Sequence, residues 1–129
     1  MSNIIELLPL QEFFTSSNPA TQTQISDAEA TLDLKFAGEY VEYLISFGCV
    51  SIYGHEFTGI CSNPSLNVVN VTTEQKTLHN KIPENMYVIE ELHIDGIVIW
   101  QNAKGEIFQT LPFSKPQKIC NSFAEYLDL

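Results

Sequence analysis

The sequence predicts a single α+β domain over residues 1–129, with a mainly antiparallel central sheet flanked by N-terminal helices and a short C-terminal helix. Two observations predict this class. Helical patterns occupy the first part of the chain, whereas short apolar runs separated by turn residues begin at Met86. A chain of 129 residues is long enough to bury one hydrophobic core and too short for two ordinary domains.

The clearest helical pattern begins near Glu39, ends before Gly48 and carries an aromatic stripe. Glu39 lies in the first turn, where the helix dipole favours a carboxylate, and Gly48 lies where a left-handed residue ends a helix. Because apolar side chains three and four residues apart share one face of a helix, this stripe is predicted to face the core. Its members are Tyr40, Tyr43, Leu44 and Phe47.

A second helix precedes this element and a strand follows it. Ser26, with Glu29 three residues later, matches the capping box of a helix start, so a helix is predicted from Ser26 onward. Residues 51–60 are rich in Ile, Tyr and Phe and predict a strand, with Gly54 and Gly59 as bend or bulge points. The expected order is helix, helix, strand.

This order and its residues resemble the SUKH superfamily, whose core reads roughly E, L, then L-P-x-x-Y-x-x-F-L, then an N-G-G turn and a strand. The matching residues here are Glu29, Leu32, Phe36, Tyr40, Tyr43 and Leu44. Ala37 stands where the family usually has proline, and Gly48-Cys49 replaces most of the Asn-Gly-Gly turn. The resemblance extends more loosely to the hairpin around Asp95-Gly96 and to the final helix, and it implies a central sheet with flanking helices.

The segments on either side of this core carry further helix and strand patterns. Residues 3–14 are dense in Ile, Leu and Phe and predict a helix, with Pro9 at its beginning or at a kink. Residues 68–71 contain three valines and predict a short strand. Thr72 then opens a predicted small helix that ends near Asn80.

The C-terminal part of the chain predicts the sheet. Strand-like runs occupy residues 86–92, 97–102 and 106–111. Turn signals separate them at residues 95–96 and 102–105. Residues 97–100 are apolar on both faces, which predicts a central strand covered on both sides. Ser122, with Glu125 three residues later, predicts a third capping box and a short final helix.

The charge balance narrows the classes of partner. Six lysines, no arginine and sixteen acidic residues give a net charge of −10, which predicts repulsion of nucleic acids and anionic membranes and attraction of basic proteins. Without arginine, bidentate phosphate recognition is disfavoured. The N-terminal stretch lacks the basic start of a signal peptide and contains Glu6, Pro9 and Glu12, so a cytoplasmic location is expected.

The residues that carry chemistry are scattered, so we expect no enzyme activity, no cofactor and no metal site. His55-Glu56 and the pair His93 and Asp95 would form a metal or acid/base cluster if their strands were neighbours. Such pairs are common on polar strand faces and in turns, and this is the interpretation that we favour. Cys49 has no histidine near it in sequence and is interpreted as a buried structural thiol. A small hydrolase is therefore the least supported function.

The SUKH resemblance implies an immunity protein that binds a cognate polymorphic toxin domain, such as a nuclease, and neutralises it by occlusion. The alternative that the resemblance also implies is a regulatory or scaffold protein that binds a cellular partner, as in the cell-wall control attributed to the fungal branch. We expect a basic toxin as partner, and a monomer or weak dimer. The predicted partner-binding residues are Glu39, Glu42, Glu56, Glu90, Glu91 and Asp95. The alternative for each of them is a solvated acidic side chain with no partner.

Overall fold

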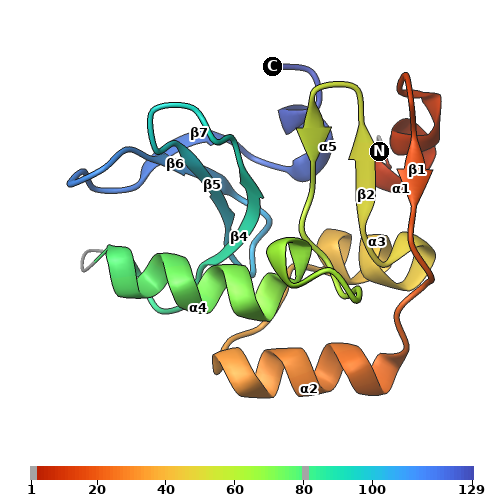
Figure 1. Cartoon of the computed structure of the whole chain (residues 1–129), viewed down its shortest axis with the longest axis horizontal. Coiled ribbons are helices and arrows are strands. Elements are labelled where there is room, and N and C mark those ends of the chain that lie inside the picture. Colours follow the sequence, from red (N-terminus) through yellow and green to blue (C-terminus); the bar gives the residue numbers. More distant parts are fainter. Residues whose placement is uncertain (1–2, 80–81) are drawn as a thin grey trace.

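The computed structural model describes residues 3–79 and 82–129, and it contains both helices and antiparallel strands (Figure 1). The α-helices are α1 (Ile4–Leu7), α2 (Gln22–Leu32), α3 (Gly38–Phe47), α4 (Val68–Leu78) and α5 (Phe123–Tyr126), and the 3-10 helices are η1 (Leu8–Leu10) and η2 (Pro64–Leu66). The strands are β1 (Thr15–Ser16), β2 (Val50–Ile52), β3 (His55–Glu56), β4 (Tyr87–Glu91), β5 (Val98–Gln101), β6 (Ile107–Thr110) and β7 (Gln117–Cys120). The predicted α+β class is confirmed.

The strands form two antiparallel sheets, whereas the sequence predicted one central sheet. One has the order β1-β2-β3 and the other the order β4-β5-β6-β7. An isolated antiparallel bridge between Phe57 and Glu90 connects the end of the first sheet to the edge of the second. In Figure 1 the four-stranded sheet stands over α4, the three-stranded sheet lies beside it, and α2 runs below α4. This arrangement brings β3 next to β4.

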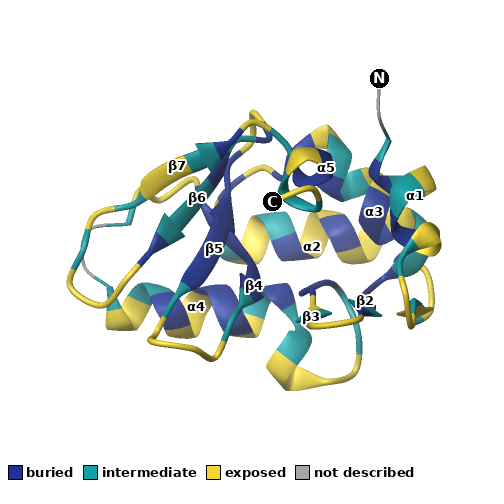
Figure 2. Ribbon diagram, turned by 90° about the horizontal axis from the view of Figure 1, so that it is seen from above, coloured by how far each residue is buried: buried dark blue, intermediate teal, exposed yellow. Residues whose placement is uncertain are grey.

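Strand β5 is the predicted central strand and is buried along its whole length (Figure 2). Successive side chains of a strand point to opposite faces of the sheet, and β5 accordingly contributes to two hydrophobic clusters. Trp100 packs with Val71 of α4 on one face, and Ile99 joins the larger core with the α3 side chains on the other. The indole N–H of Trp100 donates to the hydroxyl of Thr110 at 2.9 Å, so its polar atom is satisfied in the core.

The aromatic stripe of α3 faces the larger core as predicted. Tyr40, Tyr43 and Leu44 are fully buried, and Phe47 is half-buried at the edge of the core. The helix ends at Gly48, which has a φ of 74°. An added Cβ at Gly48 would lie 2.1 Å from the backbone oxygen of Asn18, so glycine is needed for the close approach as well as for the turn.

The start of α2 differs from the prediction. The N-cap is Thr21, whose hydroxyl accepts from the N–H of Gln24, and the side chain of Gln24 accepts from the N–H of Thr21 in return. Ser26 therefore lies inside the helix. The Thr21 and Gln24 pair satisfies the same capping pattern one turn earlier and allows a longer helix to cover the core with Ile25 and Ala28.

Two predicted strands were also wrong. Residues 51–60 do not form one strand, because Gly54, with a φ of 80°, reverses the chain between β2 and β3. Residues 68–71 begin helix α4, since the side chain of Asn67 caps two of its N–H groups and Val68 and Val71 pack inward. Burial of these valines outweighs their strand propensity. Helix α4 ends at Leu78; the predicted end near Asn80 lies outside the described residues.

At the two ends of the chain, the structure agrees with the predictions from sequence only in part. Residues 3–14 form the short α1 followed by η1, with Pro9 in the first turn of η1, and not one long helix. Strand β7, which follows Pro112 and Pro116, was not predicted from the sequence. Ser122 caps the start of α5 as predicted, because its hydroxyl accepts from the N–H of Glu125 at 3.0 Å. The other half of the predicted capping box differs, because the Glu125 carboxylate accepts from the N–H of Asn121 and not from that of Ser122. Within the described residues no helix has both the length and the apolar character to cross a membrane.

Candidate functional site

Three of the six predicted acidic residues line one concave surface, and a fourth lies in the adjoining turn. We call this surface the acidic hollow. It has a volume of about 330 Å³ and is lined by Ile52, Gly54, His55, Glu56, Glu90, Glu91, Leu92 and His93. Asp95 is exposed in the turn between β4 and β5, two residues after His93. The structure therefore brings Glu56, Glu90, Glu91 and Asp95 into one region of the surface.

The hollow forms where the two sheets meet. Gly54 reverses the chain so that β3 runs back toward β4, and the bridge between Phe57 and Glu90 holds the two strands together. His55-Glu56 and His93 consequently lie at the same site, which fulfils the condition that their strands are neighbours. This juxtaposition depends on a contact between segments more than thirty residues apart, with Phe57 and Glu90 as its pair.

Glu90 is the structural centre of the hollow, because its side chain is only 2% exposed and both carboxylate oxygens are occupied. The hydroxyl of Tyr126 in α5 donates to one oxygen at 2.5 Å, and Nδ1 of His55 lies 2.7 Å from the other. Burial raises the pKa of the Glu90 carboxyl above its ordinary value, and the hydrogen bonds from Tyr126 and His55 oppose that rise. Glu90 thus ties α5 and β3 to β4 and offers little surface to a partner.

The other three acids of the hollow remain accessible. Glu56 and Asp95 are exposed, and Asp95 is held in a left-handed turn conformation with a φ of 54°. Glu91 is half-buried, and its Oε2 accepts from Nε2 of Gln75 in α4 at 2.5 Å. Within the described part of the chain, Oε1 of Glu91 makes no hydrogen bond and no ion pair. Glu56, Glu91 and Asp95 are therefore the candidate partner-binding acids of this surface.

The remaining two predicted residues, Glu39 and Glu42, line a different pocket of about 540 Å³ that also contains Lys104. Glu39 accepts hydrogen bonds from the N–H groups of Phe123 and Ala124 at 2.7 and 3.0 Å, and so it caps the start of α5. Its carboxylate supports the fold. Glu42 lies on the exposed face of α3, as predicted. The structure does not bring these two residues to the acidic hollow.

The lysines that the structure describes lie away from the hollow. None of them is among its lining residues, and Lys81 lies outside the described residues. Lys118 pairs with Glu106 at 2.9 Å, and Lys35 lies 3.9 Å from Glu29. Lys76 donates to the backbone oxygen of Glu84. Among the described residues that line the hollow, no lysine therefore neutralises its carboxylates.

The hollow carries acid/base groups but no nucleophile. Its lining includes two histidines and three glutamates, and it contains no serine, threonine, cysteine or lysine side chain that a base would activate. Cys49 is buried, and burial raises the pKa of its thiol above the ordinary value. Among the described residues no group of three or more His, Cys, Asp or Glu side chains is arranged to hold a metal ion. This arrangement of histidine and glutamate side chains is suited to binding a charged group.

Sequence reasoning did not identify the residues that shape this site. The pairing of Glu90 with Tyr126, and of Glu91 with Gln75, joins residues from different elements and leaves no local pattern. One signal was available for a neighbouring surface: Phe113 lies between Pro112 and Pro116, which do not favour a strand, and no periodic pattern assigns it to the core. An aromatic residue in such a turn is a candidate for surface recognition.

The structure is that of an α+β domain with a concave surface lined by acidic residues. The model of the SUKH_6 family, described as SMI1-KNR4 cell-wall, matches residues 22–127. The chain therefore belongs to this family, and the SUKH resemblance in its sequence is confirmed. No curated protein gives a significant match to the chain.

Proposed function

We propose that this protein is an immunity protein that binds a basic toxin domain through the acidic hollow and neutralises it by occlusion. The observation that carries the proposal is the grouping of three accessible carboxylates, Glu56, Glu91 and Asp95, around one concave surface. The described residues that line this surface include no lysine. Membership of the SUKH_6 family supports a role in binding proteins. Occlusion requires no chemistry by the immunity protein itself, in keeping with a hollow that contains no nucleophile.

Electrostatic attraction supplies the physical basis for rapid neutralisation. A net charge of −10 attracts a basic partner over distances of about one Debye length, roughly 8 Å at physiological salt. Complementary charge raises association rates toward 10⁸ to 10⁹ M⁻¹s⁻¹ from about 10⁵ to 10⁶ for neutral pairs. A nuclease, whose substrate cleft is basic, is the finer form of the proposal, because an acidic surface competes there with nucleic acid.

A second candidate function is that of a regulatory or scaffold protein that binds a cellular protein. The observation that favours it is the cell-wall description of the matching family. In that case the hollow would bind a basic segment of a resident partner, and no toxicity would need to be neutralised. The gene neighbourhood separates the two functions, since a toxin reading frame beside this gene favours immunity.

Co-expression tests the proposal directly. Where a toxin reading frame lies beside this gene, its toxin domain is expressed with the parent protein or with a double charge reversal, Glu91→Lys with Asp95→Lys. We expect the parent to restore growth and the double variant to lose protection. Asp95 is exposed, whereas Glu91 is half-buried and bonded to Gln75, so circular dichroism and a thermal melt first establish that the double variant is folded. Full protection by the folded double variant contradicts the proposal. The matched control is Glu12→Lys with Asp27→Lys, which changes the net charge equally at exposed positions outside the hollow.

A further inference from the structure

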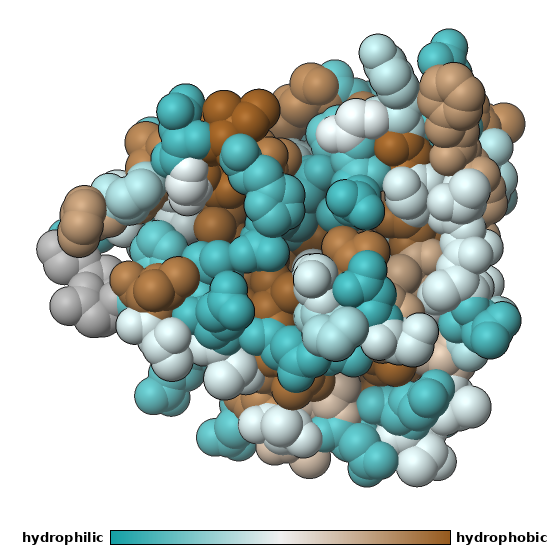
Figure 3. Space-filling model, viewed as in Figure 1, coloured by the Kyte–Doolittle hydropathy of each residue, from teal (hydrophilic) through white to brown (hydrophobic). Residues whose placement is uncertain are grey.

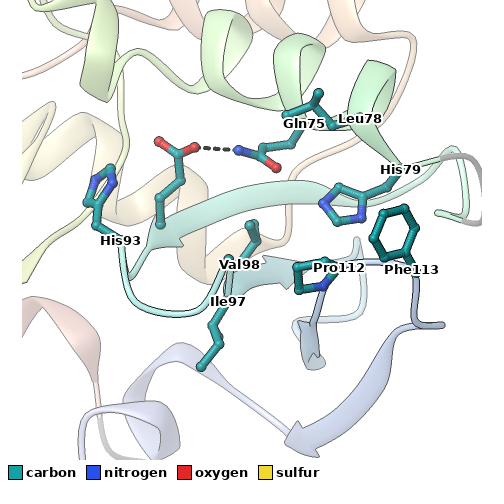
Figure 4. A pocket seen from close by; sticks show the side chains of 10 residues that line it. Gln75, Leu78, His79, His93, Ile97, Val98, Pro112 and Phe113 are labelled. Carbon is teal, nitrogen blue, oxygen red and sulfur yellow. Dashed lines mark hydrogen bonds between the residues drawn. The ribbon is translucent and has the colours of Figure 1, made fainter.

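An apolar groove adjoins the acidic hollow. It lies between the end of α4, the start of β5 and the turn between β6 and β7, and it has a volume of about 270 Å³. Figure 4 shows His93 toward one end, with His79, Pro112 and Phe113 toward the other. Glu91 and His93 line both the groove and the hollow, so the two form one continuous surface. The groove is smaller than the roughly 300 to 1,000 Å³ of small-molecule sites, and its size suits a single side chain.

Phe113 is held at the rim of this groove in an unfavourable backbone conformation. The N–H of Ser114 donates to the oxygen of Leu111 at 3.1 Å and closes a turn in which Pro112 is second and Phe113 third. Phe113 has a φ of 64°, a conformation that glycine favours at the third position of such turns. Its side chain is 99% exposed and returns no burial energy within this chain. Residue 113 therefore has the backbone strain of a non-glycine residue at positive φ, without the stabilisation that burial of an aromatic side chain usually gives.

A second large apolar side chain is exposed at the same groove. Leu78, at the end of α4, is 69% exposed and lines the groove with Ile97 and Phe113. The space-filling view shows apolar surface between hydrophilic side chains over α4 and the four-stranded sheet (Figure 3). A groove lined by exposed apolar side chains and rimmed by polar residues is typical of sites that bind another protein.

We propose that the groove docks a bulky apolar side chain of the basic partner, and that a lysine or arginine adjacent to that side chain pairs with Glu91. This inference rests on the proposed function and names the segment that the surface recognises. The charge of Glu91 supports this pairing, because Glu91 lies where the groove meets the hollow. Its Oε2 accepts a hydrogen bond from Gln75, whereas its Oε1 makes no hydrogen bond or ion pair among the described residues. The recognised segment is therefore apolar and cationic at neighbouring positions.

The two halves of the surface have different tasks. The hollow, with Glu56 and Asp95 near it, attracts any basic protein and sets the rate of encounter. The groove discriminates among basic proteins, because only a segment with a large apolar side chain fills it and removes Phe113 and Leu78 from water. A buried aromatic or aliphatic anchor of this type usually dominates the lifetime of a complex.

Three synthetic peptides test the proposal against the ¹⁵N-labelled full chain by NMR. The first is a lysine peptide with one central phenylalanine, the second has glycine in place of the phenylalanine, and the third has glutamates in place of the lysines. We expect the first to shift the amide signals of Leu78, Glu91, Ile97 and Phe113 saturably, with an affinity at least tenfold above that of the other two. The absence of such shifts, or equal affinity for the glycine peptide, overturns the proposal.

Two variants with matched backbone effects locate the binding. Phe113→Gly removes the aromatic ring from the groove, and Phe13→Gly removes an exposed ring, also at a positive φ of 59°, from outside it. We expect Phe113→Gly to reduce affinity for the phenylalanine peptide at least tenfold and Phe13→Gly to leave it unchanged. Leu78→Ser provides a second loss-of-binding variant. Equal effects of the Phe113 and Phe13 variants contradict a specific groove.

The outcomes distinguish this proposal from the proposed function. Protection against the toxin that depends on Glu91 but not on Phe113 overturns the groove and leaves the immunity function in place. Specific peptide binding at the groove without any protection overturns the immunity function alone. Sedimentation of the protein without peptide tests whether the groove binds a second copy of this chain. Self-association that Phe113→Gly abolishes would assign the groove to that second copy and contradict the proposal.

Discussion

The carboxylate of Glu39 accepts a hydrogen bond from the N–H of Phe123, 84 residues later, at 2.7 Å. The same carboxylate binds the N–H of Ala124 and Nε2 of Gln101, so it fixes the start of α5 against α3 and β5. Helix starts leave N–H groups without partners inside the helix, and a carboxylate from another element satisfies them here. A residue that the sequence placed on a binding surface therefore supports the tertiary structure.

Glu39→Ala is expected to lower the free energy of unfolding by at least about 2 kcal/mol, because each donor left without its partner costs roughly 1 to 3 kcal/mol. Urea denaturation measures the change. Glu42→Ala is the matched control on the same helix, and its exposed side chain predicts a change within about 0.5 kcal/mol. Equal stability of the two variants would show that capping by Glu39 contributes nothing.

Tyr43→Phe is expected to destabilise the protein by about 1 to 3 kcal/mol without changing its shape, because the lost hydroxyl serves two partners in the core. That hydroxyl donates to the backbone oxygen of Thr58 at 2.7 Å and accepts from the N–H of Val50 at 3.1 Å. Thermal melts compare it with Tyr53→Phe, whose parent ring is exposed. If both variants melt together, the buried hydroxyl is not a stabilising link between α3 and β2.

Glu90→Gln is expected to alter the pH dependence of stability. Burial raises the folded-state pKa of Glu90 above its ordinary value of 4.5. The stability that comes from protonation of Glu90 is therefore fully present below pH 4.5 and is lost as the pH rises through the folded-state pKa. Glutamine does not titrate, so the variant gains stability relative to the parent as pH rises from 4.5. Urea unfolding across this range measures the difference.

Tyr126→Phe provides the opposite variant for the same test. The Tyr126 hydroxyl lowers the pKa of Glu90 by donating to it, and its removal should raise that pKa further and steepen the loss of stability with pH. A difference between Glu90→Gln and the parent that stays constant with pH, together with an unchanged slope in Tyr126→Phe, would contradict the role assigned to burial.

Phe113→Gly is expected to leave the free energy of unfolding unchanged or to raise it by up to about 1 kcal/mol, because glycine adopts a positive φ without steric cost. The side chain it removes is exposed, so no burial is lost. Phe57→Ala is the contrast, since Phe57 is fully buried and its truncation should cost about 3 to 5 kcal/mol. A large loss of stability in Phe113→Gly would mean that the ring supports the fold.

The parts of the fold that could be predicted from the sequence are those determined by residues close together in the chain. The stripe of α3, the central strand β5 and the cap of α5 at Ser122 each follow from residues close together in the chain. The errors arose where tertiary packing decided between local options. Residues 68–71 have strand propensity, yet they are helical because Asn67 caps them and because Val68 and Val71 pack into the core.

The sequence showed which acidic residues were available for the candidate site, but it did not show how they are arranged in space. The acidic residues were evident, whereas their division between two pockets depends on which strand pairs with which. The bridge from Phe57 to Glu90 gathers the acids of the hollow, and no spacing in the sequence encodes a contact of that range. The burial of Glu90 and the capping role of Glu39 likewise come from partners on distant elements.

The most direct test of the acidic hollow is the association rate of the purified protein with the toxin domain encoded beside its gene, measured by stopped flow from about 50 to 500 mM salt. We predict that the parent rate falls at least about tenfold across this range and that Glu91→Lys with Asp95→Lys slows association at low salt far more than Glu12→Lys with Asp27→Lys. A rate that is independent of salt, with equal effects of the two pairs, would contradict binding of a basic partner through this surface.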